Sequence, residues 1–231
     1  MKILALETSA RACSAAVTED GQVIASAFQC TGLTHSRTLM PMVEDMLKNA
    51  GLTMQDCGAI AVANGPGSFT GIRISVAAAK GLAFAAGLPA VGVSTLEAMA
   101  RSLGVYQGYA LGVMDARRAQ VYAGLFRVNC GKYTRVMEDS AISLEDLRKV
   151  LQKCSEPIFL VGDGSILCYN TLLESVPALV LPPEHRMHQR ADGVALAALE
   201  MIDRGDPGNG ITLTPNYLRL SQAERERLQK S

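Results

Sequence analysis

The sequence has few residues that could hold a metal ion or form a disulfide framework. Its 231 residues include three histidines and six cysteines, and no two cysteines have the C-x-x-C spacing. Scattered cysteines of this kind are typical of reduced thiols, and they argue against both a disulfide framework and a zinc site. We therefore expect no bound metal.

The sequence also lacks an excess of charge and a long apolar run. Its 22 basic residues balance its 22 acidic residues, which argues against strong, direct binding to nucleic acid. No apolar run reaches membrane-spanning length, and the N-terminal MKILALETSARA lacks the layout of a signal peptide. We expect a cytoplasmic protein that does not associate with membranes.

What is present is enough apolar sequence for a large core. The chain is 48% hydrophobic and long enough for one large domain or two small ones. Its central segment predicts a short strand at 59–63, a glycine loop, a helix at 72–86 and a strand at 90–93. This order of strand, loop, helix and strand is typical of parallel sheets.

The glycine loop and the first turn of the chain form a candidate anion site. Glycines allow close approach of another group, and the N–H groups at the start of a helix favour an anion. The spacing does not match the known nucleotide loops, so a tight turn for close packing explains it at least as well. The first strand, 2–6, ends in a carboxylate and two hydroxyls, which could hold a metal or phosphate or could cap the strand end. The residues of this candidate vestigial phosphate site are Glu7, Thr8, Ser9, Gly65, Gly67 and Gly71.

The second half of the chain repeats the order of elements in the first. Both halves predict the order β-β-β-α-β-α, and glycines at 104–108 suggest a joint between an N-terminal lobe, 1–104, and a C-terminal lobe, 105–231. The remaining strands expected in the first lobe are 14–17 and 22–28, and the remaining helices are 35–49 and one from the Ser94 capping box to Leu103. The second lobe is expected to have strands at 109–114, 120–127, 133–137 and 157–161, and helices at 143–153, 166–173 and 191–204. The charged tail at 221–231 is expected to fray.

Two helices of the first lobe carry apolar faces that suggest a partner subunit. The helix at 35–49 has a methionine-rich stripe, which is usually core but is also common on binding surfaces. The helix at 72–86 has small or apolar side chains nearly all round, so it should bury more than one side. The residues predicted to form this partner interface are Leu39, Met40, Val43, Met46, Leu47, Ile74, Ala78, Gly81 and Ala85.

The repeated unit and several motifs resemble known families. An acidic residue follows the first strand of each half, at Glu7 and Asp115, as in the duplicated α/β fold of the actin-like ATPases, which is related to ribonuclease H. Six segments in order resemble the TsaB (YeaZ) family, and they span almost the whole chain. These segments are ALETS at 5–9, HSRTLMPMV at 35–43, NGPGSFTGIRI at 64–74, GVSTLEAMA at 92–100, MDARRAQVY at 114–122 and PNYLR at 215–219.

This resemblance implies a role in tRNA modification. Proteins of the TsaB family help to form N6-threonylcarbamoyladenosine at position 37 of tRNAs that read codons beginning with A. The resemblance implies a non-catalytic subunit that binds and stabilises the catalytic paralogue TsaD through helices of its N-terminal lobe and works with the ATPase TsaE. It further implies a homodimer when the protein is alone, only indirect contact with tRNA, and ATP or ADP bound only in complex with the partners.

The catalytic paralogue offers a comparison at two positions. TsaD has two histidines spaced i, i+4 that hold a metal, and the matching positions here are Thr95 and Met99. Neither side chain is a plausible ligand for such a metal. The resemblance therefore implies a chain without catalytic residues.

Two other functions remain open from the residues. A stand-alone ATPase or small-molecule kinase would use Glu7, Thr8, Asp115 and the loop at 65–71 to hold Mg-phosphate. A glycoprotease-like hydrolase would use Ser9, Ser68 or Cys30 with His35 as the base, although nothing in the spacing ties His35 to a serine.

Two groups of arginines are harder to assign. Arg73 follows the glycine loop and could bind an anion or pair with Glu7, although a solvated or ion-paired arginine is the more common case. The run Asp115-Ala116-Arg117-Arg118, followed by Tyr122, is expected to fix the joint between the lobes.

Overall fold

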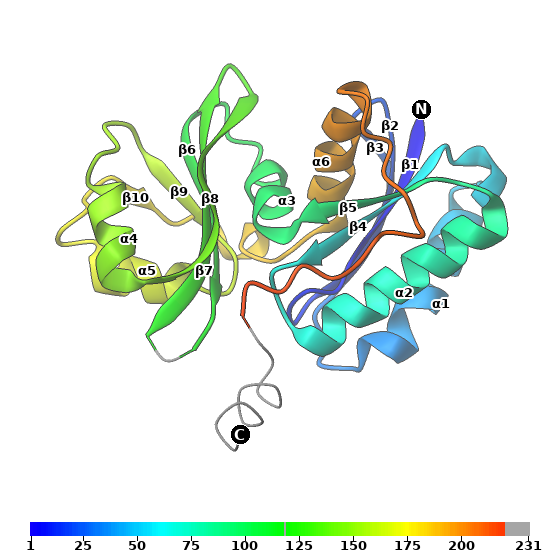
Figure 1. Ribbon diagram of the computed structural model, residues 1–231, viewed down its shortest axis with the longest axis horizontal. Coiled ribbons are helices and arrows are strands. Elements are labelled where there is room, and N and C mark those ends of the chain that lie inside the picture. The colour runs from blue at the N-terminus through cyan, green and yellow to red at the C-terminus, as the bar shows by residue number, and fades with distance from the viewer. Residues whose placement is uncertain (118, 220–231) are drawn as a thin grey trace.

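The computed structural model describes residues 1–117 and 119–219 as two α/β lobes side by side (Figure 1). Each lobe has a five-stranded sheet, in the orders β3-β2-β1-β4-β5 and β10-β9-β6-β7-β8. Arg118 and the predicted charged tail at 221–231 lie outside the described residues.

The first lobe follows the predicted order of elements. Its strands are β1 (Lys2–Glu7), β2 (Cys13–Glu19), β3 (Gln22–Gln29), β4 (Ala59–Gly65) and β5 (Ala90–Ser94). Its helices are α1 (His35–Asn49), α2 (Phe69–Ala86) and α3 (Thr95–Ser102), with a short 3₁₀ turn at Met54–Asp56. Strands β1 to β3 are antiparallel, whereas β1, β4 and β5 are parallel, as the crossover through α2 requires.

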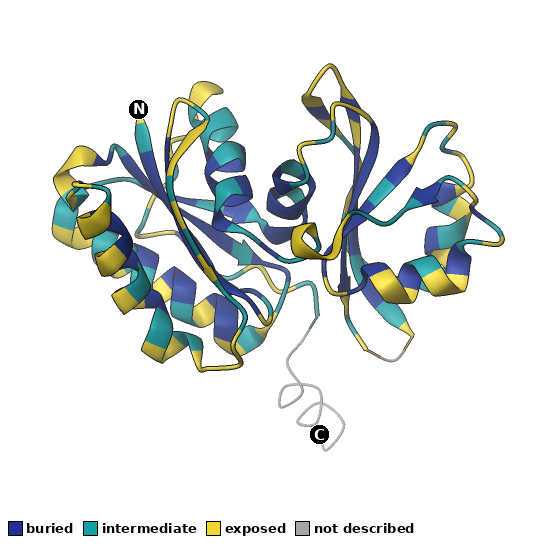
Figure 2. Ribbon diagram, turned by 180° about the vertical axis from the view of Figure 1, so that it is seen from behind, coloured by how far each residue is buried: buried dark blue, intermediate teal, exposed yellow. Residues whose placement is uncertain are grey.

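The central strand β1 is buried on both faces because its alternate side chains enter two different cores. Leu4 and Leu6 lie in the core beneath α1 and α2, whereas Ile3 and Ala5 lie in a core with α6 on the opposite face. This alternation is the period of two expected of a strand. Figure 2 shows the buried strands in the middle of each lobe, with the exposed residues on the outer sides of the helices.

The second lobe repeats the topology of the first. Its strands are β6 (Gln107–Asp115), β7 (Gln120–Asn129), β8 (Lys132–Ser143), β9 (Ile158–Val161) and β10 (Leu179–Val180), and its helices are α4 (Leu144–Leu151) and α5 (Ser165–Leu172). A 3₁₀ turn at Glu184–Arg186 precedes α6 (Ala191–Asp203). The short strand β10 was not predicted, and β8 runs six residues beyond the expected end at Met137, to Ser143.

The expected C-terminal lobe at 105–231 requires a correction. Helix α6 packs against β1, β2 and β4 of the first lobe and against α3, where Gly193 allows its backbone to approach Ala98 closely. The chain then runs back along the first lobe, and Leu213 enters the core beneath α1 and α2. We call residues 205–219 the C-terminal strap. The second lobe therefore ends before α6, because the last helix and the strap complete the first lobe.

Candidate functional site

The structure brings together the six residues of the candidate phosphate site, but it seals three of them from solvent. Glu7, Thr8 and Ser9 are all 0% exposed. The backbone N–H of Ser9 donates to Glu7 Oε1 at 2.5 Å, and the Thr8 hydroxyl donates to the Gly71 carbonyl at 2.7 Å. These groups bind the protein itself, so the turn offers no accessible ligand to a phosphate or metal in this arrangement.

The glycines of the loop serve close packing. A Cβ at Gly71 would lie 2.0 Å from the Thr8 carbonyl oxygen, and a Cβ at Gly67 would lie 2.5 Å from that of Ser9. A Cβ at Gly65 would lie 2.2 Å from the carbonyl oxygen of Asn216 in the C-terminal strap. The loop is therefore pressed between the first turn and the strap, as the tight-turn interpretation predicted. Helix α2 begins at Phe69 rather than Ile72, because the Ser68 hydroxyl accepts the Gly71 N–H at 3.2 Å and caps the helix early.

Burial also changes the chemistry of the carboxyl group in this turn. Complete burial raises the pKa of Glu7 to about 7, although hydrogen bonds from Ser9 lower it. Glu7 Oε2 is buried and has no hydrogen-bond partner among the described residues. A sealed carboxyl group that is partly protonated near neutral pH is poorly suited to holding Mg²⁺ for a stand-alone ATPase.

The positions that match the metal ligands of TsaD are filled with packed side chains. Thr95 and Met99 are both fully buried in α3. Met99 packs with Met114 and Val161 of the second lobe, and its sulfur lies 3.0 Å from where a Cβ at Gly162 would be. Within residues 1–117 and 119–219, no group of three or more His, Cys, Asp or Glu residues is placed to hold a metal ion.

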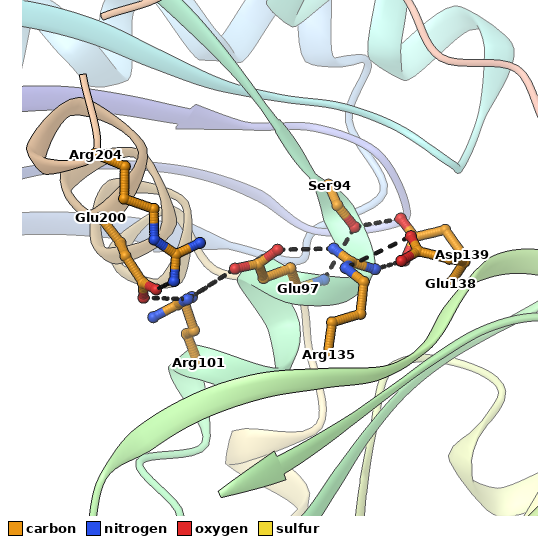
Figure 3. Close-up of polar contacts among 8 residues, drawn as sticks. All are labelled: Ser94, Glu97, Arg101, Arg135, Glu138, Asp139, Glu200 and Arg204. Atoms are coloured by element: carbon orange, nitrogen blue, oxygen red, sulfur yellow. Dashed lines mark hydrogen bonds and ion pairs between the residues drawn. The ribbon is translucent and has the colours of Figure 1, made fainter. Parts of the chain in front are cut away.

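An ion-pair network joins the lobes beside this packed region (Figure 3). Arg135 of β8 contacts Asp139 Oδ1 at 2.5 Å and Glu97 Oε2 of α3 at 2.7 Å. Arg101 of α3 contacts Glu97 Oε1 at 2.7 Å and Glu200 of α6 at 2.5 Å. The network therefore links β8, α3 and α6, which are far apart in sequence.

Only one motif in the sequence indicated part of this network. The predicted capping box at Ser94-x-x-Glu97 is half correct: the Ser94 hydroxyl accepts the Glu97 N–H at 3.1 Å, but the Glu97 carboxylate pairs with the arginines instead. The same hydroxyl donates to Asp139. Burial raises the pKa of Asp139, whereas Ser94 and Arg135 lower it. These contacts suit a rigid joint between the lobes.

Four of the predicted interface residues on α1 are not on the surface. Leu39, Val43, Met46 and Leu47 are 1–7% exposed and belong to the first lobe's own core, so their prediction as partner-facing residues is wrong. The apolar stripe of α1 is covered by the sheet and by α2. Met40 alone among the five is exposed, at 41%.

The outer face of α2 fits the prediction of an uncovered apolar surface better. Ala77, Gly81, Phe84 and Ala85 are exposed there, and Ile74 and Ala78 are half-buried. Phe84 is 91% exposed, which is unusual for a large apolar side chain. Contrary to our expectation for the sequence, the 18 residues of α2 are long and apolar enough to cross a membrane by length and composition alone, with a mean hydropathy of 1.3.

The residues of the hydrolase hypothesis do not form a nucleophile–base pair. His35 Nε2 lies 2.8 Å from the Ala10 carbonyl oxygen. Ser9 is buried, and the Ser68 hydroxyl caps α2. Within the described residues, neither serine nor Cys30 is hydrogen-bonded to His35.

The arginines near the joint are held by the C-terminal strap. Arg73 does not pair with Glu7; its Nε donates to the Tyr217 hydroxyl at 2.7 Å. Arg219 donates to the Ala116 carbonyl at 2.8 Å, which ties the strap to the turn between β6 and β7. In that turn the Asp115 carboxylate accepts the Arg117 N–H at 2.7 Å.

Comparisons with known proteins agree with this architecture. A family model described as "TsaD: tRNA N6-adenosine threonylcarbamoyltransferase" matches residues 29–170. The chain is 32% identical over 226 residues to the tRNA threonylcarbamoyladenosine biosynthesis protein TsaB of Bacillus subtilis, covering 97% of this chain and 96% of that protein. It is 38% identical over 167 residues to TsaB of Escherichia coli, covering 71% of this chain and 72% of that protein.

Solved structures show the same fold. A Pseudomonas aeruginosa protein described as similar to the peptidase YEAZ superposes with a TM-score of 0.78 at 27% identity, covering 94% of this chain and 99% of that one. A structure described as YeaZ from the same organism superposes with a TM-score of 0.73 at 27% identity and equal coverage. The duplicated lobes are those of the actin-like ATPase fold, as predicted.

Proposed function

The chain belongs to the TsaB family of tRNA threonylcarbamoyladenosine biosynthesis proteins, and from this premise we propose that it is a non-catalytic subunit of the modifying complex. Its task is to bind and stabilise the catalytic paralogue TsaD, together with the ATPase TsaE. The complex forms N6-threonylcarbamoyladenosine in tRNAs that read codons beginning with A.

The outer face of α2 is the observation that carries this proposal. Only six of the 18 residues of α2 are buried, and Ala77, Gly81, Phe84 and Ala85 are exposed to solvent. Exposed apolar surfaces of this kind mark interaction sites in many proteins. The small side chains Ala77, Gly81 and Ala85 would let a partner helix approach closely. A standard interface buries roughly 1,600 Å² in total, which helices from two subunits could supply.

The burial of the candidate phosphate site supports the proposal that this chain is not the catalyst. Glu7, Thr8 and Ser9 are sealed, and the glycine loop is packed against them. The buried Thr95 and Met99 stand where TsaD has its metal ligands. These arrangements stabilise the fold, and they leave the chemistry to the paralogue.

A charge on the α2 face tests the interface. We expect Ala77→Glu to prevent co-purification with TsaD, because burying an unpaired carboxylate in an apolar contact is costly. Asn170→Glu, at an exposed position of α5 in the second lobe, adds the same charge away from the face and should co-purify normally. Both variants should keep the thermal stability of the wild type. Wild-type yield of TsaD with Ala77→Glu would contradict the proposed interface.

Calorimetry with Mg-ATP on the isolated chain tests the absence of catalysis separately. We expect no binding at micromolar concentrations and no turnover. Micromolar affinity together with ATP hydrolysis would favour the stand-alone ATPase instead.

A further inference from the structure

The described arginines fall into two groups according to their partners. Ion pairs with carboxylates hold Arg101, Arg127, Arg135, Arg148, Arg190 and Arg204. Arg11, Arg37, Arg73, Arg117, Arg186 and Arg219 form no such pair with any residue in 1–117 or 119–219. Of these six, Arg73, Arg117 and Arg219 belong to segments that meet at the joint between the lobes, where α2 begins and the C-terminal strap ends.

Two aromatic side chains, Phe69 and Tyr217, lie beside Arg73. The rings of Phe69 and Tyr217 are stacked, with centroids 4.5 Å apart and an interplanar angle of 25°. The Arg73 guanidinium carbon lies 5.5 Å from the Tyr217 ring centroid, and its Nε donates to the Tyr217 hydroxyl. We call Phe69, Arg73, Arg117, Tyr217 and Arg219 the arginine–tyrosine cluster.

The strap brings the second half of the cluster into place. Arg219 donates to the carbonyl of Ala116, so its guanidinium lies beside the backbone that carries Arg117. Figure 1 shows the red end of the described chain running along α2 to the junction of the lobes. Phe69, Tyr217 and Arg219 lie close together there.

The cluster is accessible and locally positive. Arg73 and Arg117 are exposed, and Tyr217 is 37% exposed. Arg73 and Arg219 form no ion pair within the described residues, and the Asp115 carboxylate in the neighbouring turn accepts the backbone N–H of Arg117. The cluster also lies at the N-terminal end of α2, where the helix dipole is positive. The balance of 22 basic and 22 acidic residues over the whole chain hides this local excess.

We propose that the arginine–tyrosine cluster binds a single-stranded segment of RNA, an inference that rests on the proposed role in tRNA modification. Exposed aromatic rings bind bases by stacking, and nearby guanidiniums bind the phosphates and stack on bases themselves. Arginines that lack carboxylate partners can neutralise phosphates without first breaking an ion pair. An acidic peptide would satisfy the guanidiniums, but it would make no use of the stacked rings.

The site adjoins the surface proposed for TsaD and extends away from it. Arg73 lies one turn before Ala77, whereas Gly81, Phe84 and Ala85 lie towards the other end of α2. RNA could therefore occupy the cluster while a partner helix covers the outer face. This placement would give the subunit a direct contact with the tRNA, beyond the indirect role that the family resemblance implies.

The test is fluorescence anisotropy of the full chain, alone and with TsaD, using a labelled tRNA anticodon stem-loop as the probe. Arg73→Gln and Arg219→Gln should each weaken binding severalfold and make the logarithmic salt dependence shallower by roughly 0.7. Tyr217→Leu should weaken binding roughly tenfold without changing that slope, because it removes stacking rather than a phosphate contact. Tyr217→Phe keeps the ring and should bind like the wild type. Arg37→Gln, which removes an exposed charge from α1, is the matched control and should also bind normally.

The outcomes separate this inference from the proposed function. Ala85→Glu, about three turns from Arg73 in α2, should lose TsaD and keep the RNA, so either result can fail alone. The inference is overturned if neither the chain nor its complex with TsaD binds the stem-loop, or if the cluster variants bind it as tightly as Arg37→Gln does. It is also overturned if Arg73→Gln and Tyr217→Leu lose TsaD while RNA binding is unchanged, since the cluster would then be a protein contact.

Discussion

Gly81 offers a test in which the stability of the chain and its association with a partner should move in opposite directions. This glycine lies inside α2 on its exposed face, and a Cβ placed on it would meet nothing within 4 Å. Glycine inside a helix costs about 1 kcal/mol relative to alanine. Gly81→Ala should therefore stabilise the isolated chain by about 1 kcal/mol, which corresponds to a rise of about 2–4 °C in Tm for a chain of this size.

The same methyl group should weaken association if a partner helix packs closely against Gly81. Adding a methyl group to a closely packed contact typically costs about 1–3 kcal/mol, which is roughly a tenfold loss of affinity or more. Scanning calorimetry of the chain and titration with TsaD give the two quantities independently. A higher Tm with unchanged affinity would place the partner elsewhere, and a lower Tm would show that the outer face of α2 is not open.

Three further predictions concern stability. Glu7 has a folded-state pKa of about 7, above the ordinary value of 4.5, so its protonated form stabilises the fold below pH 4.5. Roughly 3 kcal/mol of this stability is lost as the pH rises through 7. In thermal melts from pH 5 to 8, the Tm of Glu7→Gln should therefore decline less steeply than that of the wild type, and equal slopes would refute this assignment. Val43→Ala should lower the free energy of unfolding in urea by about 2 kcal/mol, because the Val43 side chain is 2% exposed. Met40→Ala should change it by less than about 0.5 kcal/mol, because Met40 is exposed. Equal effects of the two substitutions would contradict the orientation of α1. Arg135→Met leaves Asp139 without its cation and should lower the free energy of unfolding by about 2 kcal/mol in the same assay. This value is smaller than that of a fully buried ion pair because the Arg135 side chain is 24% exposed. An unchanged unfolding midpoint would show that the network does not stabilise the joint.

Local patterns were sufficient to predict most of the elements. Helix α1 has its predicted ends at His35 and Asn49, because its periodic pattern is uninterrupted and Gly51 follows. The extent of β8 was missed because Glu138 and Asp139, which follow the predicted end at Met137, are unusual inside a strand. The pairing of Asp139 with Arg135, and of Arg135 with α3, becomes visible only in the folded structure.

Which neighbour covers an apolar face could not be predicted in the same way. The pattern in α1 correctly groups Leu39, Val43 and Met46 on one side, but it cannot say whether a sheet or another subunit lies there. Helix α6 follows the second lobe in sequence, and no local feature indicates that it packs on the first. Contacts such as Arg73 with Tyr217, separated by 144 residues, likewise depend on the path of the C-terminal strap.

The central claim is that this subunit acts by binding TsaD through the outer face of α2 and that the sealed turn at Glu7 has no catalytic role. A tRNA-modification assay reconstituted with TsaD, TsaE and the threonylcarbamoyl-adenylate synthetase tests it most directly. We predict that omitting the chain or supplying Ala77→Glu abolishes modification, whereas Glu7→Gln supports it at the wild-type rate. Full activity with Ala77→Glu, or none with a folded Glu7→Gln chain that still binds TsaD, would contradict the account.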